Sequence, residues 1–308
     1  MTAADGYARF VEGTPVADHP SAVPASAAAA SDVLAALALV KHGRVYNLDC
    51  GPFPGMPIFP GHPPFQVLSY RTPHGIANQG DQHWLGDNEV SFYWQSEMVM
   101  GTVHSGTHVD ALAHITCGAR HEWFGGSCEE EHSGDFGPLR GDATEIPPLI
   151  ARGVLIDVAG ARGVAALAAH ESIGAGELGD ALARQDVELR RGDVALIRTG
   201  YLSGWPDAEF IAAHEQAGID RDAALWLAEH GAVAVGADTE ALEVLPSTVA
   251  GNPHPVHIAL LNERGIFIIE MVDCEELARD RVYEFCFVCL PLAIRGATGS
   301  MVRPVALC

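Results

Sequence analysis

The chain has 308 residues, of which 48% are hydrophobic and 19% are charged. This composition is that of an ordinary globular protein with a large core, and the length is compatible with one domain. The 40 acidic and 18 basic residues give a net charge of −22, which repels phosphate backbones and anionic lipids, so we expect neither nucleic acid nor a membrane surface as a partner.

Residues 1–30 are rich in Ala, Pro and Ser and show little periodicity, which is typical of an extended arm. They lack the charged start and continuous apolar stretch of a secretory signal, and no segment of the chain has the length of a membrane span. We therefore expect a cytoplasmic protein. A helix is predicted over 33–42, so that residues 1–44 would form an arm and a helix before a single domain over 45–308.

A Pro-rich loop follows the first predicted strand, Val45 to Asp49. The loop runs from Gly51 to Pro64 and contains six prolines. Stiff loops of this length more often contribute to a binding or catalytic site than serve only as connections. Two further strands are predicted after it, over 66–70 and 89–100.

Compact apolar runs alternate with helical patterns in the rest of the chain. Each run is bounded by Gly or Asp, as is typical of strands buried on both faces. The predicted strands are 153–158, 193–199, 232–237, 265–272 and 284–290. The predicted helices are 207–216 and 221–230. There is no internal repeat and no clear linker, so the sequence predicts a single mixed α/β domain.

The seven cysteines are scattered and odd in number, which does not indicate a disulfide framework. Cys286 and Cys289 form a C-x-x-C, but they lie within a strand pattern. A redox pair would open a helix beside a strand. We therefore interpret both as packed core thiols.

Three histidines and an aspartate lie within eleven positions, at His104, His108, Asp110 and His114. In an extended chain even-numbered residues share a face, so the first three side chains can converge on one point. The segment after Asp110 suits the start of a helix, which would place His114 on the same side as Asp110.

Two imidazoles and one carboxylate are a common metal-ligand set that leaves coordination positions open for catalysis. A divalent metal held there would lower the pKa of bound water towards about 7 and polarise an acyl oxygen. His114 could then move protons between the nucleophile and the leaving group. The alternative is a hydrogen-bonded histidine cluster near a turn.

Three other polar residues stand out less strongly. Glu270 lies in an otherwise apolar predicted strand, and a buried carboxylate needs a partner or a cation. His257 lies at a predicted helix start, where a histidine is commonly a cap or a surface residue. Asp238 follows a predicted strand and is expected to order a turn rather than to contact substrate.

The string His-x-Gly-Thr-His-x-Asp-x-x-x-His resembles the signature of the cyclase-like metal-dependent hydrolases. That family includes kynurenine formamidase, isatin hydrolase and the trans-dienelactone hydrolases. The resemblance extends over roughly Val45 to Leu307. Gly-Met-Pro-Ile-Phe-Pro-Gly, from Gly55, resembles the family's early loop, and Gly-Ala-Asp-Thr, from Gly236, resembles its strand end. His257 and Glu270 resemble its later His and Glu.

The resemblance implies a fold of the swivelling β/β/α type and a site of five metal-binding residues: His104, His108, Asp110, His257 and Glu270. It also implies that His114 is the catalytic acid/base and that Phe59 lines the substrate pocket. In some members the later His and Glu hold a second metal. Leu112 stands where many members have Pro, so the chain looks more like the longer branch near the dienelactone hydrolases.

The function predicted in this way is hydrolysis of a cyclic or aryl-linked amide, imide or lactone by metal-activated water. A metal-dependent polyketide-type cyclase and a non-catalytic metal or small-molecule binding protein are the alternatives. The ligand set accepts Mn or Zn, and its carboxylate content favours Mn slightly. We further expect a small-molecule substrate and a homo-oligomer, either a dimer or a tetramer.

Overall fold

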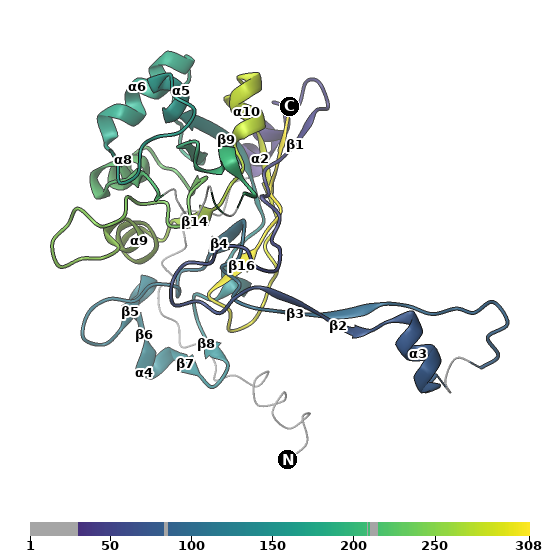
Figure 1. Cartoon of the computed structure of the whole chain (residues 1–308). Coiled ribbons are helices and arrows are strands. Elements are labelled where there is room, and N and C mark those ends of the chain that lie inside the picture. Colours follow the sequence, from purple (N-terminus) through teal and green to yellow (C-terminus); the bar gives the residue numbers. More distant parts are fainter. Residues whose placement is uncertain (1–29, 83–85, 208, 210–214) are drawn as a thin grey trace.

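A nine-stranded mixed sheet runs through the centre of the computed structural model, which describes residues 30–82, 86–207, 209 and 215–308 (Figure 1). In spatial order its strands are β1 (Val45–Asn47), β17 (Val305–Leu307), β15 (Glu284–Cys289), β9 (Leu149–Asp157), β11 (Val194–Arg198), β13 (Ala234–Ala237), β14 (Phe267–Glu270), β4 (His108–Asp110) and β16 (Gly299–Met301). The four strands β9, β11, β13 and β14 are parallel to one another, and β9 and β14 pair antiparallel with β15 and β4 on the two outer sides.

The parallel strands form the core because their residues are apolar on both faces. No residue of β11, β13 or β14 is exposed. All five of the later predicted strands are present, and Cys286 and Cys289 are buried free thiols on β15, as predicted. The predicted mixed α/β fold class is therefore confirmed.

Helices α5, α6, α8 and α9 lie together on one side of the sheet (Figure 1). The helices of the described residues are α2 (Ala30–Leu37), α3 (Pro73–Gln79), α4 (Glu129–His132), α5 (Val158–Arg162), α6 (Ala175–Gln185), α8 (Arg221–Glu229), α9 (Pro255–His257) and α10 (Glu275–Asp280), with the π-helix η5 (Ile258–Arg264) and the 3₁₀ turns η2 (Phe124–Gly126), η3 (Ala143–Glu145) and η4 (Tyr201–Gly204). None of them has the length and apolar character needed to cross a membrane.

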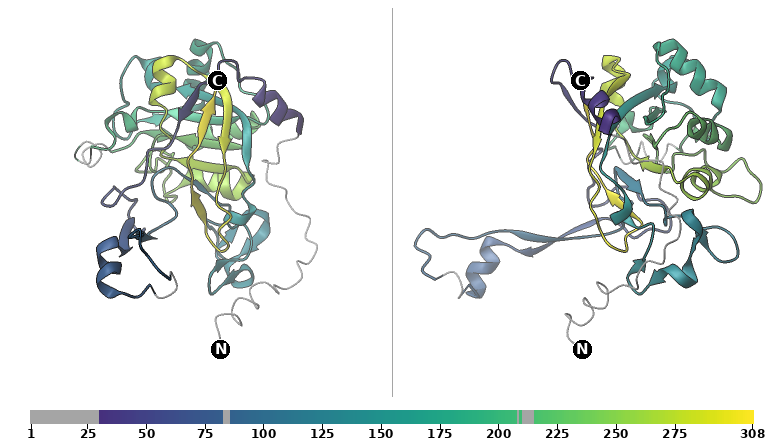
Figure 2. Two further views of the ribbon diagram at one scale, coloured as in Figure 1. Left: turned by 90° about the vertical axis from the view of Figure 1, so that its right-hand side faces the viewer. Right: turned by 180° about the vertical axis from the view of Figure 1, so that it is seen from behind.

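Four two-stranded sheets lie outside the central sheet. Three are short: β5 (Glu122–Trp123) with β6 (Ser127–Cys128), β7 (Ser133–Gly134) with β8 (Gly137–Pro138), and β10 (Ser172–Ile173) with β12 (Gly218–Ile219). The fourth pairs β2 (Gln66–Arg71) with β3 (Ser96–Met100). Together with α3 it projects far from the rest of the molecule (Figure 2), and we call β2, α3 and β3 the hairpin.

Two element predictions were wrong in their bounds. The first helix is Ala30–Leu37 rather than 33–42, because the chain then turns to let the His42 and Arg44 amides donate to the Cys308 carbonyl. Of the predicted strand 89–100 only β3 forms, because the Asn88 side chain bonds the backbone of Phe92 and holds that segment in a loop.

Two further predictions fall wholly or largely outside the described residues. They are the extended arm at residues 1–30, of which only residue 30 is described, and the helix over 207–216. The predicted helix over 221–230 corresponds to α8, whose first turn is capped because the Asp220 carboxylate accepts from the Ala223 amide.

Candidate metal centre

The centre of the motif forms the short strand β4, in which successive side chains point to opposite faces of the sheet. Val109 of β4 is fully buried in the core, and His108 and Asp110 point from the opposite face. β4 pairs with β14 in a register that places Glu270 directly opposite His108. Glu270, which the sequence singled out as a carboxylate in an apolar strand, is therefore the cross-strand neighbour of His108.

Two glycines allow His104 to approach the same point. Gly106 has a φ of +58°, a left-handed conformation that turns the chain between His104 and β4. Gly299 of β16 lies opposite Asp110, where a Cβ atom would stand 2.8 Å from Cε1 of His104. His104 can then place its Nδ1 2.8 Å from Oδ1 of Asp110.

The imidazoles of His108 and His257 are oriented by hydrogen bonds on their outer sides. The His108 Nδ1–H donates to the Gly106 carbonyl at 2.8 Å, and the His257 Nδ1–H donates to Oε1 of Glu243 at 2.5 Å. Their Nε2 atoms face inward, each 3.2 Å from an oxygen of Glu270. Histidines that bind metals usually donate their other ring N–H to a carbonyl or a carboxylate in this way.

Within the described residues, two buried carboxylate oxygens at this point lack a hydrogen-bond partner. They are Oδ2 of Asp110 and Oε1 of Glu270. With the ring protons on Nδ1, the inward Nε2 lone pairs of His108 and His257 face these carboxylates, which is repulsive unless a cation lies between them. The donor set of imidazole nitrogens and carboxylate oxygens therefore fits a divalent metal such as Mn or Zn.

The pKa values show how strongly this cluster attracts positive charge. Burial acts to lower the pKa of His108, but the hydrogen bond to Glu270 and the charges of Glu270 and Asp110 raise it to about 9. Burial acts to raise the pKa of Asp110, but the surrounding histidines bring it well below its usual range. In the protein without a metal, protons on His108 and His257, whose pKa values are both raised, balance the carboxylates.

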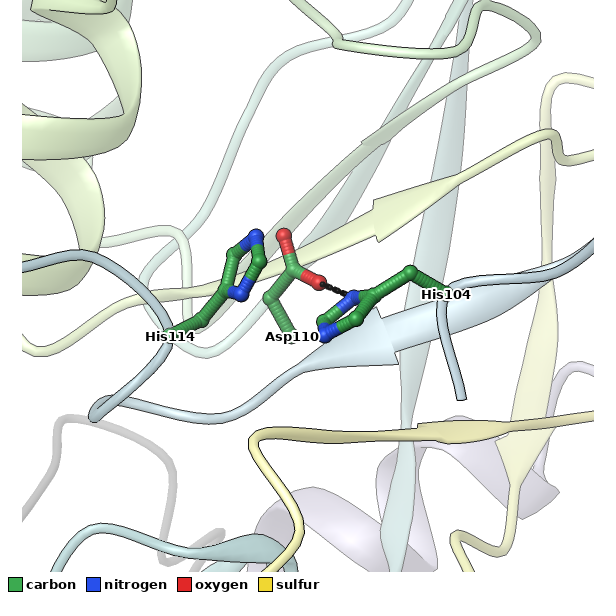
Figure 3. A group of neighbouring side chains, drawn as sticks. All are labelled: His104, Asp110 and His114. Atoms are coloured by element: carbon green, nitrogen blue, oxygen red, sulfur yellow. Dashed lines mark hydrogen bonds and ion pairs between the residues drawn. The ribbon is translucent and has the colours of Figure 1, made fainter. Parts of the chain in front are cut away.

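His114 lies against the same group of side chains (Figure 3). Its ring stacks on that of His104 with the centroids 4.0 Å apart, and burial is the main cause that lowers its pKa to about 3. The predicted helix after Asp110 does not form; residues 111–114 make a turn instead. The Ala111 and Ala113 amides donate to the carbonyls of Thr298 and Gly141, which ties this turn to two distant segments.

His104, His108, His114, His257 and Glu270 line a cavity of about 270 Å³, just below the range of roughly 300–1,000 Å³ for small-molecule pockets. The Pro-rich loop forms a wall, and Phe59 is one of its residues that line the cavity. The Phe59 ring packs edge-on against His254, with the ring centroids 5.8 Å apart.

The sequence reasoning missed four residues of this region. His62, His254 and Glu240 line the cavity, and Glu243 holds His257 from behind. Glu243 follows Leu242 and precedes Val244, so it carries the signal that singled out Glu270, a carboxylate within an apolar stretch.

Asp238 orders a turn, as the sequence suggested. Its buried carboxylate accepts hydrogen bonds from the amide and hydroxyl of Thr199 and from the amide of Gly200. These bonds join the ends of β11 and β13, and Asp238 does not line the cavity.

Comparisons with known proteins agree on one family. The model of the Cyclase family, described as "Putative cyclase", matches residues 47–244. A crystal structure of a novel cyclase is 28% identical, with 91% of this chain and 92% of that chain covered and a TM-score of 0.78. No curated protein sequence matches the chain.

Two more distant structures share the fold. Isatin hydrolase A from Ralstonia solanacearum is 20% identical, with 95% of this chain and 99% of that chain covered and a TM-score of 0.62. A potential metal-dependent hydrolase with cyclase activity is 20% identical, with 85% of this chain and 98% of that chain covered and a TM-score of 0.53. Because the family model covers well over half of its residues, this chain belongs to the Cyclase family.

Proposed function

We propose that this protein is a metal-dependent hydrolase that opens a cyclic or aryl-linked amide, imide or lactone. The observation that carries the proposal is the pair of inward Nε2 atoms, of His108 and His257, beside the buried carboxylates of Asp110 and Glu270, each of which has one oxygen without a hydrogen-bond partner among the described residues. The similar structures named as hydrolases support the same reaction class.

Five residues would hold the ion: His104, His108, Asp110, His257 and Glu270. The chemistry that a divalent ion supplies there is Lewis acidity towards an acyl oxygen and towards water. Since two of the five ligands are carboxylates, we propose Mn ahead of Zn.

His114 is proposed to move the proton. Because burial lowers the pKa of His114 to about 3, its imidazole is unprotonated at neutral pH and can accept a proton from the attacking water. It can then donate that proton to the leaving nitrogen or oxygen. Its place in the lining of the cavity, in contact with His104, supports this role.

Phe59 is proposed to pack against the ring of the substrate. It lies in the Pro-rich loop with Met56 and Ile58, which also line the cavity. This apolar wall favours a compact, ring-bearing substrate and limits the access of bulk water.

The experiment combines metal analysis of the purified protein with a panel of lactones, imides and aryl formamides assayed in ¹⁸O-labelled water. A hydrolase incorporates solvent oxygen into the product acid. Turnover without incorporation would instead indicate a cyclase, and bound metal without any turnover would indicate a binding protein.

We also propose that the protein forms a homo-oligomer through the hairpin. Two-stranded hairpins are marginally stable in water by themselves, and this one exposes Val67, Leu68, Met98 and Val99. Val67 and Val99 are cross-strand neighbours, so Val67→Lys with Val99→Lys should yield a monomer in sedimentation. Leu290→Lys, at an exposed leucine elsewhere, is the control, and an unchanged oligomer in the double variant would exclude the hairpin as the interface.

A further inference from the structure

Glu240 is a second acidic side chain of the cavity that lies outside the set of proposed metal ligands. It follows β13 in the chain, and the carbonyl of the preceding residue, Thr239, accepts from the Met271 amide at 3.0 Å. This contact places Glu240 beside the end of β14, where Glu270 faces the metal centre. Both carboxylates line the same cavity.

The Glu240 carboxylate is held by one of its two oxygens. The hydroxyl of the buried Tyr201 donates to Oε1 at 3.0 Å. The Glu240 amide donates to the side chain of Gln216, which fixes the backbone. Within the described part of the chain no group donates to Oε2, so this oxygen remains available as an acceptor for a bound molecule.

The charges around the cavity favour a neutral molecule. Among the described residues that line it there is no Lys or Arg. A divalent cation would balance Asp110 and Glu270, which leaves the charge of Glu240 uncompensated. An anionic substrate would therefore be repelled, whereas a polarised N–H group would be attracted.

We propose that Glu240 selects neutral substrates that carry an N–H group next to the scissile carbonyl, namely cyclic imides and amides rather than lactones. This inference rests on the proposed hydrolase function and narrows its substrate class. The N–H would donate to Oε2 of Glu240 while the neighbouring carbonyl lies at the metal centre. Tyr201 acts as a positioning residue that orients the carboxylate.

The test uses three ring compounds of matched size on the Mn-loaded protein at pH 7: phthalimide, N-methylphthalimide and phthalide. The wild type should prefer phthalimide. Glu240→Leu should lower kcat/KM for phthalimide by about 10- to 100-fold, the worth of a hydrogen bond to a charged group, and should leave N-methylphthalimide nearly unchanged. Glu240→Gln keeps an oxygen acceptor and should lower kcat/KM for phthalimide by a smaller factor than Glu240→Leu.

Two controls separate this role from a structural one. Glu229→Gln removes an exposed charge at the end of α8 and should change none of the three rates. Tyr201→Phe should lower the preference for phthalimide over N-methylphthalimide without loss of bound metal. Equal losses on both compounds in Glu240→Leu would overturn the proposal.

The two hypotheses can also fail separately. Hydrolysis of phthalide but not of phthalimide would overturn the N–H assignment and leave the hydrolase function standing. Absence of turnover for these three compounds and for every lactone, imide and formamide of the larger panel would overturn the hydrolase function itself.

Discussion

The Glu243 carboxylate holds His257 by two contacts, one to the ring and one to the backbone. Its Oε1 accepts from Nδ1 of His257 at 2.5 Å and from the His257 amide at 3.2 Å, and its Oε2 accepts from the Val256 amide at 3.1 Å. Glu243 therefore fixes both the helix start and the direction in which the imidazole points.

Glu243→Gln should weaken metal binding by roughly 10- to 100-fold, the usual effect of losing a residue that orients a ligand. Its amide NH₂ would face the Val256 amide in place of an acceptor, so the free energy of unfolding should also fall by about 1–3 kcal/mol. Calorimetric metal titration and urea unfolding measure the two effects, with Glu229→Gln as the control. Unchanged metal affinity would exclude the orienting role.

Substitution of His104, His108 or Asp110 by Ala should remove metal and activity together, because each change deletes one proposed ligand. Metal content can be measured by plasma mass spectrometry after gel filtration, alongside turnover of the best substrate. Full metal occupancy in all three variants would contradict the proposed ligand set.

His114→Ala should retain the metal and lose about 10²- to 10⁴-fold in kcat, the contribution of a positioned acid or base. A ring nitrogen of His114 lies within 4.8 Å of a ring nitrogen of His104 and of a carboxylate oxygen of Asp110, so this variant also tests whether His114 is a ligand. If it loses metal as completely as His108→Ala, then His114 binds the ion rather than moving protons.

His114 should also make the metal-free protein sensitive to acid. Burial lowers its folded-state pKa from 6.5 to about 3, so between these values the unfolded chain binds more protons. Stability is therefore lost as the pH falls through this window. Between pH 7 and pH 5, the free energy of unfolding of the wild type should fall by about 2 kcal/mol relative to that of His114→Gln, as measured by urea unfolding. A constant difference would show that His114 titrates normally.

Glu270→Gln keeps the shape of the side chain and removes its charge. We expect metal affinity to fall by roughly 10- to 100-fold and turnover to fall with it. The reason is that the negative charge beside the Nε2 atoms of His108 and His257, which would help to hold the ion, is removed. Normal affinity and rate with reduced thermal stability would indicate a purely structural carboxylate.

The sequence was informative where one local rule decides the structure. Alternation along β4 places His108 and Asp110 on one face, and burial of a carboxylate in an apolar strand singles out Glu270. The buried parallel strands were recognisable for the same reason, since their apolar runs suit no other environment.

Contacts between distant segments decided the rest. After Asp110 the chain makes a turn instead of the expected helix, and the Ala111 and Ala113 amides donate to the carbonyls of Thr298 and Gly141, which are not visible in the local pattern. Glu240 has no periodic or motif signal at all. Its place in the cavity follows from its neighbour Thr239, whose carbonyl bonds to Met271.

The register of β4 on β14 has a consequence for folding. His108 and Glu270 face each other only once β14 has docked, and most of the domain's chain lies between them in sequence. Contacts of such high sequence separation form late, because their loop-closure entropy must be overcome first. On the proposed assignment, a cation would therefore bind only after β14 has paired with β4, and its uptake during refolding would report that pairing.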